Sequence, residues 1–257
     1  MLFFLYSPIA VLIVYSFNES KSRANWSGFT LKWYAQLFGD PGIMNALATT
    51  LSVAALSSAA ATTIGTAAAI GIDSMKGAKK RLVMGLTNIP VVIPEIVIGV
   101  SLMILFMYVC GALGVGMGYH TLLLAHVIFN VPFVILSVLP KLRQTDENLI
   151  EAALDLGASP SSAFFKVLLP QIMPGVITGA MLAFTLSIDD FIVSFFTAGA
   201  GTTNLSILIF SMARLGINPK INALSAIMFT VVLLLLYLIN KRETINKKRR
   251  EKNAQIR

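Results

Sequence analysis

The chain is poor in several residues and motifs on which common protein functions depend. Its 257 residues include a single cysteine, Cys110, so no intrachain disulfide can form and no second thiol is present for redox chemistry. Its two histidines, His120 and His126, lack the spacing of a metal site and the partners of a catalytic triad. The phosphate-binding pattern G-x-x-x-x-G-K-[ST] is absent. The chain is therefore not an ATPase by itself, and nothing in it supports nucleophilic catalysis or a cofactor.

Charged residues are also scarce, at 12% of the chain, compared with about a quarter in soluble proteins. Hydrophobic residues make up 56%. Most of the length consists of apolar runs near the ~20 residues that cross a bilayer as a helix. This composition predicts an all-α integral membrane protein with one polytopic domain over residues 1–257.

Six apolar runs are long enough, or nearly so, to span a membrane. They cover residues 1–17, 45–72, 82–109, 121–139, 172–197 and 221–239. The second run is dense in Ala, Ser, Thr and Gly, which predicts close packing against other helices. Residues 18–43 are polar and carry aromatic side chains, which is typical of a segment at the bilayer interface.

The net charge of +8 does not indicate nucleic-acid binding, because the basic residues gather between the spans and in the tail at 240–257. Of the 20 Lys and Arg residues, 15 lie in the loop after the second span, in the loop at about 141–171 and in the tail. The positive-inside rule places these segments in the cytosol. Both termini are then cytosolic.

Three carboxylates fall inside the predicted spans, at Glu95, Asp189 and Asp190. An ionised carboxylate in a bilayer costs a few kcal/mol or more, so such residues usually face a partner or a watery path. Pro90 and Pro94 predict a bend in the third span next to Glu95. The three acids are therefore candidates for lining a cation path.

The pattern does not decide between the two aspartates. On a continuous helix, Asp190 shares a polar stripe with Ser187 and Ser194, whereas Asp189 lies among apolar and aromatic residues. Pairing of one or both acids with a neighbouring helix remains the structural alternative. For His126 and Asn130, one turn apart in the fourth span, we expect hydrogen bonds to neighbouring helices rather than to a ligand.

The stretch EAALDLGASPSSAFFKVLLP, residues 151–170, predicts a helix, a turn and a second helix at the membrane surface. Its spacing resembles the EAA loop of ATP-binding-cassette (ABC) importer permeases, with a Val where the family has Ile. The matching positions are Glu151, Ala152, Ala153, Gly157, Val167, Leu169 and Pro170. The resemblance implies the type I importer permease (MetI-like) fold, with six transmembrane helices and cytosolic EAA coupling helices that dock on an ATPase.

Longer stretches resemble the C-type permease subunits of spermidine/putrescine importers. They are WSGFTLKWYAQLF, PEIVIGVSLMILFM, HVIFNVPFVI, LIEAALDLGAS, FTLSIDDFIVSFFTAG and ILIFSMARLGINPKINALSAI. The resemblance implies a permease of the bacterial inner membrane, surrounded by lipid. Its implied partners are a second permease subunit, two ATP-binding subunits and a periplasmic or lipid-anchored polyamine-binding protein.

Two alternatives stay open at this point. The first is an ABC permease for another small solute; an anionic solute is disfavoured, because the predicted spans contain no Lys or Arg. The second is a cation-coupled secondary transporter or channel, which would use membrane acids but would not need an EAA loop.

Overall fold

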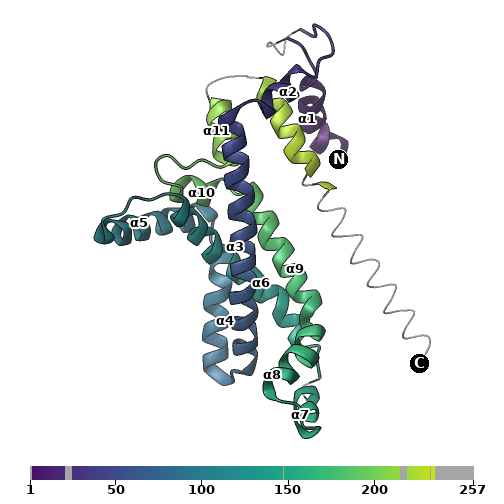
Figure 1. The fold of residues 1–257 in the computed structure, drawn as a ribbon, viewed down its shortest axis with the longest axis vertical. Coiled ribbons are helices and arrows are strands. Elements are labelled where there is room, and N and C mark those ends of the chain that lie inside the picture. Colours follow the sequence, from purple (N-terminus) through teal and green to yellow (C-terminus); the bar gives the residue numbers. More distant parts are fainter. Residues whose placement is uncertain (1, 21–24, 147, 215–218, 232, 235–257) are drawn as a thin grey trace, which may run out of the picture. The chain divides into compact units, whose positions relative to one another are not determined.

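The computed structural model describes residues 2–20, 25–146, 148–214, 219–231 and 233–234. These residues are almost entirely helical (Figure 1). The helices are α1 (Leu2–Tyr15), α2 (Lys32–Phe38), α3 (Pro41–Ser74), α4 (Gly77–Val92), α5 (Glu95–Leu113), α6 (Tyr119–Leu142), α7 (Asn148–Asp155), α8 (Pro160–Ala163), the π-helical turn η1 (Phe164–Leu168), α9 (Leu169–Asp189), α10 (Ile192–Thr197) and α11 (Leu205–Arg214). Residues 219–231 are also helical.

Within the described part of the chain, four helices are long and apolar enough to cross a membrane. They are Pro41–Ser74, Glu95–Leu113, Tyr119–Leu142 and the continuous stretch Pro160–Asp189. The second and fourth predicted spans are confirmed by α3 and α6. Most of the sixth predicted span falls in helical residues 219–231, but residue 232 and residues 235–239 lie outside the described residues, as does the tail at 240–257.

Two of the predicted spans are not continuous helices. The bend predicted in the third span is confirmed as a break at Pro94, whereas the single helix predicted for the fifth span was wrong. The third divides into α4 and α5 at Ile93 and Pro94, because a residue before proline avoids the α region and Ile93 is extended (φ −74°, ψ 140°). The fifth divides into α9 and α10 at Asp190, which is also extended (φ −61°, ψ 123°). Pro90 lies inside α4 without ending it.

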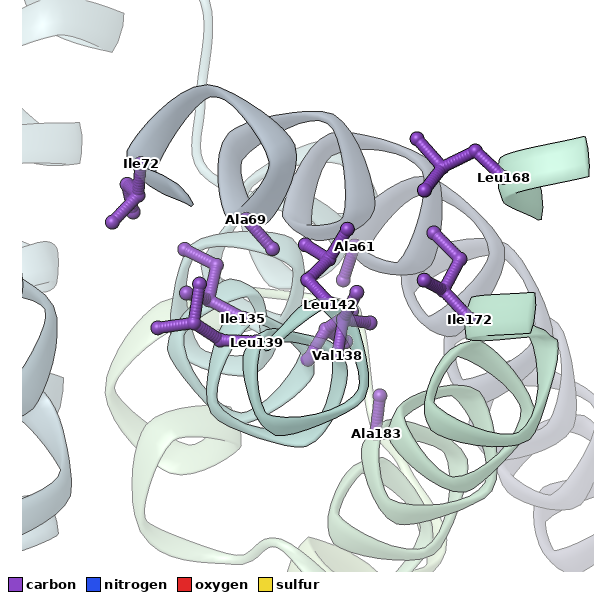
Figure 2. Close-up of a cluster of buried hydrophobic side chains, with 11 residues drawn as sticks. Ala61, Ala69, Ile72, Ile135, Val138, Leu139, Leu142, Leu168, Ile172 and Ala183 are labelled. Carbon is purple, nitrogen blue, oxygen red and sulfur yellow. The ribbon is translucent and has the colours of Figure 1, made fainter. Parts of the chain in front are cut away.

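The chain forms two compact units, of which one is Leu47–Ser206. Its hydrophobic core lies where α3, α6 and α9 meet, and Figure 2 shows the side chains from these helices converging. The core residues are Ala61, Ala69, Ile72, Val134, Ile135, Val138, Leu139, Leu142, Leu168, Ile172 and Ala183.

Glycines allow these helices to approach closely. A Cβ on Gly65 of α3 would lie 2.7 Å from Val134 Cβ, and one on Gly175 of α9 would lie 2.8 Å from the Ser137 carbonyl oxygen. Gly175 and Gly179 form a G-x-x-x-G pattern along the α6 contact, a common packing motif between membrane helices. The expected packing role of the small residues in α3 is thus confirmed.

The other unit comprises Met1–Ala46 and Ile207–Arg257. In it, Asn18 pairs with Phe29 in an isolated antiparallel bridge, and the Phe17 and Phe29 rings stack at 5.2 Å. Trp33 is buried in the unit, and its indole N–H donates to the Asn18 carbonyl at 2.8 Å. Trp26 and Phe29 are exposed, as expected for an interfacial segment.

Candidate functional site: a signature loop and two helix breaks

The Glu-Ala-Ala stretch forms α7, as the sequence predicted. Glu151 lies in the first turn, where a carboxylate interacts favourably with the helix dipole. Glu151 and Ala152 are exposed, Ala153 is half-buried, and Leu156 just beyond the helix is 89% exposed. Leu149 and Leu154 of α7 are exposed as well, and a group of exposed apolar side chains favours an interaction surface.

Gly157 terminates α7, and this role explains its position six residues after Glu151 in the sequence. The Gly157 N–H donates to the Leu154 carbonyl at 2.9 Å, and the Ala158 N–H donates to the Ala153 carbonyl at 3.0 Å. This pair of bonds is the Schellman motif, which ends a helix with a left-handed residue. Gly157 has φ +85°, a conformation that glycine adopts without strain.

The second helix of the loop begins two residues later. The Ser159 side chain accepts a hydrogen bond from the Ser162 N–H, and Pro160 occupies the first helical position. The chain continues through η1 into α9, which begins at Leu169 and Pro170. The helix, turn and helix geometry predicted for residues 151–170 is therefore present.

Glu95 lies at the break between α4 and α5. Pro94 precedes it, and Glu95 is the first residue of α5, with an exposed side chain. The structure places no hydrogen bond on its carboxylate from any described residue. Glu95 does lie within electrostatic range of Asp190 and Asp189.

The break between α9 and α10 separates the two aspartates. Asp189 is the last residue of α9 and is exposed, whereas Asp190 is 7% exposed. Because α9 ends at Asp189, the polar stripe expected for a continuous helix does not predict the directions of the two aspartate side chains. Asp189 faces outward from this chain and Asp190 faces inward.

The carboxylate of Asp190 is bonded on both oxygens. Its Oδ1 accepts from the Val193 N–H at 3.2 Å, and its Oδ2 accepts from the Ser194 N–H at 2.7 Å and the Ser194 hydroxyl at 2.8 Å. His126 Nε2 lies 3.5 Å from the same Oδ2. Asp190 therefore caps the first turn of α10 and ties it to α6.

The partners of Ser194 determine the tautomer of His126. The Ser194 hydroxyl gives its only proton to Asp190 and accepts from Asn204 Nδ2 at 2.8 Å. His126 Nε2 lies 3.0 Å from the same hydroxyl oxygen, so Nε2 must carry the proton of that hydrogen bond. The Nδ1 atom is buried and has no hydrogen-bond partner among the described residues.

A second polar cluster lies one turn away on α6. Asn130 Nδ2 donates to the Ser187 hydroxyl at 2.7 Å, and Ser187 and Ser57 are hydrogen-bonded at 3.0 Å. The expectation that His126 and Asn130 bond to neighbouring helices is confirmed. The sequence reasoning did not single out Ser57 and Asn204, since one polar residue in an apolar stretch carries little signal.

The comparisons agree with this architecture. The family described as "Binding-protein-dependent transport system inner membrane component" matches residues 61–242. The chain belongs to this family. It is thus a permease of an ABC importer and a multi-pass component of the inner membrane.

Named relatives cover most of the permease. It is 40% identical over 234 residues to the putrescine transport system permease protein PotI of Escherichia coli (strain K12), covering 89% of this chain and 83% of that protein. It is 39% identical over 232 residues to the spermidine/putrescine transport system permease protein PotC of the same organism, covering 90% and 86%.

Solved structures share the fold of the permease. A chain of a bacterial ABC transporter involved in the import of the acidic polysaccharide alginate superposes with a TM-score of 0.69 at 18% identity, covering 94% of this permease and 90% of that chain. The methionine ABC transporter MetNI in an inward-facing conformation gives a TM-score of 0.58 at 21% identity, covering 81% and 96%. At these identities the likeness concerns the fold.

Proposed function

We propose that this permease is one of two membrane subunits of an ATP-driven polyamine importer, carrying spermidine or putrescine, with residues 1–257 as one polytopic domain. The observation that carries the proposal is the pair of exposed carboxylates, Glu95 and Asp189, at the ends of membrane-spanning helices. Relatives at 39–40% identity that are named for polyamine transport support it.

Glu95 and Asp189 suit a polycationic substrate because their charges are not neutralised within the described chain. An ionised carboxylate facing lipid costs a few kcal/mol or more, whereas one facing an aqueous path does not carry that cost. Charge-assisted hydrogen bonds then replace the hydration of each ammonium group. Asp190 belongs to the same path by position, but its oxygens are occupied by Val193 and Ser194, so its contribution is to the field and to the local geometry.

ATP is hydrolysed by partner subunits, and the EAA loop transmits the resulting motion. The exposed face of α7, with Glu151 and Ala152, docks together with Leu156 just beyond it into a groove of one ATP-binding subunit. Ala153 and Gly157 fix the turn, and Leu169 and Pro170 connect it to α9. A second permease subunit completes the path, and a polyamine-binding protein delivers the substrate on the outer side.

Substitution of Gly157 tests this coupling role. Gly157→Pro removes the N–H that bonds Leu154 and cannot adopt φ +85°, so transport should be abolished while insertion stays normal. Gly157→Asn is the matched control, because asparagine tolerates the left-handed conformation. Normal polyamine import by the proline variant would contradict the docking role.

The proposed orientation has six spans with both termini in the cytosol, which puts the EAA loop on the side that contains ATP. A reporter that is active only in the cytosol, fused after Arg257, should be active. Activity of a periplasmic reporter at the same position would overturn the orientation.

The direct test is reconstitution of the complete complex in vesicles with ATP. The binding protein is preloaded with spermidine, with putrescine or with an unrelated solute, and uptake and ATPase activity are measured together. Stimulation by a polyamine alone supports the proposal. Stimulation only by another solute would leave an importer permease of different specificity, and uptake without ATP would indicate a secondary transporter.

A further inference from the structure

The short helix α10 lies close to the segments that carry the two exposed acids, Glu95 and Asp189. Asp189 ends α9 only three residues before Ile192, where α10 begins. Glu95 lies one turn before Gly99 on α5, and Gly99 is one of the points where α5 packs against α10. Any shift of α10 therefore changes the separation between the Glu95 and Asp189 carboxylates.

Gly99 makes the contact between α5 and α10 very close. A Cβ at this position would lie 3.0 Å from Phe196 Cδ2 and 3.3 Å from the Ile192 carbonyl oxygen. These distances are shorter than ordinary van der Waals contacts, so a methyl group here would require α5 or its neighbours in α10 to shift by a few tenths of an ångström. The glycine thus sets how near Glu95 comes to α10.

Buried hydrogen bonds hold α10 at both of its ends. At its start, Asp190 caps Val193 and Ser194, and the Ser194 hydroxyl contacts His126 of α6 at 3.0 Å. At its end, the Thr121 hydroxyl of α6 lies within hydrogen-bond distance of the Thr197 carbonyl oxygen, at 2.7 Å, and of the Gly118 carbonyl oxygen, at 2.8 Å. A helix of six residues has little stability alone, so these contacts determine its position.

We propose that the cluster of Asp190, Ser194, His126 and Asn204 positions α10, and that α10, through Gly99, sets the separation of the two path acids and so the length of polyamine that is preferred. Asp190 is a positioning residue in this account and does not contact substrate. The inference rests on the proposed polyamine path.

Selection by length follows from the shape of the substrate. Spermidine and putrescine share one spacing of neighbouring charges, but the two terminal ammonium groups of spermidine lie farther apart than those of putrescine. A wider separation of two carboxylates therefore suits the terminal charges of spermidine better. A lengthening of one ion pair from about 4 to about 4.5 Å in a partly desolvated site weakens its attraction enough for roughly a twofold change in preference.

The test replaces Gly99 with alanine in the complete complex. Turnover is measured with binding protein saturated with either spermidine or putrescine, so the ratio reports the permease. Gly99→Ala should shift the ratio toward the longer spermidine by about twofold. Gly111→Ala is the control on the same helix, because no heavy atom lies within 4 Å of its added Cβ.

A second variant perturbs the cluster itself and keeps every acid. Ser194→Ala removes the hydroxyl that links Asp190, His126 and Asn204, and it should change the spermidine to putrescine ratio by at least about twofold. Ser194→Thr restores a hydroxyl and should recover the wild-type ratio in part. Ser52→Ala, which loses only a bond to the Thr49 carbonyl within α3, is the matched control.

The outcomes separate this inference from the proposed function. A wild-type complex that carries neither polyamine overturns the proposed function. If the wild type carries polyamines and both variants assemble but keep the wild-type ratio, or lose both activities equally, the positioning role is wrong. A shift of Gly99→Ala toward putrescine would also contradict it.

Discussion

The two helix breaks in the membrane part of this permease are made in different ways. Between α4 and α5, Pro94 forces Ile93 into an extended conformation, and the adjacent Glu95 stays exposed. Between α9 and α10 there is no proline, and the break is stabilised by hydrogen bonds to the buried Asp190 carboxylate. Where proline breaks the helix, the neighbouring carboxylate of Glu95 is not needed to stabilise the break and stays exposed.

The comparison shows that an acid in a membrane helix is not by itself a sign of a substrate site. Asp190 is as unexpected in an apolar run as Glu95, yet its oxygens are occupied by N–H and O–H donors from the same chain. Asp189 is its neighbour in sequence but resembles Glu95 in exposure. The donors around each carboxylate, rather than its presence, separate structural from functional acids.

The largest expected effect is a difference in stability between variants of the buried Asp190 and of the exposed Glu95. Asp190→Ala removes the acceptor of three hydrogen bonds and leaves buried donors unpaired, so it should cost about 1–3 kcal/mol of stability. Glu95→Ala should cost less than about 1 kcal/mol, because an exposed side chain is lost. The amount of assembled complex and its thermal unfolding midpoint measure both. Equal losses in the two variants would remove the distinction.

Transport should respond in the opposite order. Asp189→Asn and Glu95→Gln keep volume and remove charge, so each should weaken substrate interaction by about 1–3 kcal/mol, or roughly five- to 150-fold, with normal assembly. Glu95→Asp keeps the charge and should be tolerated. Polyamine uptake and stimulated ATPase activity, normalised to assembled complex, provide the measurement. Unchanged kinetics in both neutral variants would rule out the cation path.

The difference between the breaks also explains what sequence reasoning achieved. The break at Pro94 was readable, because proline restricts the residue before it and lacks an N–H. The break at Asp190 was not, since the stretch SIDDFIVSFF contains neither proline nor glycine and keeps an apolar helical pattern. The Asp190 carboxylate accepts from Val193 and Ser194, three and four residues on, and Ser194 is hydrogen-bonded in turn to His126, which is far along the chain.

Local signals were sufficient in the EAA loop. Gly157, Ser159 and Pro160 carry the end of one helix and the start of the next, and each acts on its immediate neighbours. The choice between Asp189 and Asp190 was out of reach for the opposite reason. A helical wheel assumes a continuous helix, and only the contacts of Asp190 with α10 and α6 show that the helix ends.

A smaller effect is expected from substitution of His126, whose hydrogen bond to Ser194 helps to hold the break at Asp190. If Nε2 donates to Ser194, then His126→Gln supplies an amide N–H donor in a similar place and should retain most of the stability. His126→Leu offers no donor and should be less stable than the glutamine variant by about 1 kcal/mol. Thermal unfolding of the two purified complexes measures the difference. Equal midpoints would contradict the assigned hydrogen bond.

The smallest effect concerns a carboxylate outside the spans, Asp40, which lies 3.4 Å from Lys220 Nζ. Partial burial alone would raise the pKa of Asp40, but hydrogen bonds from Lys220 and from the Ile43 and Gly42 N–H groups hold that pKa below its usual range. A lowered folded-state pKa means that the pair stabilises the protein above about pH 3.9 and that this contribution is lost as the pH falls further. Since the pair is partly exposed, Asp40→Asn should cost about 0–1 kcal/mol at neutral pH and nothing in acid. Thermal midpoints measured at neutral pH in low and high salt should show a small loss of stability that depends on salt. A loss as large as that of Asp190→Ala would mean that the exposure of a carboxylate does not predict its contribution to the stability of this permease.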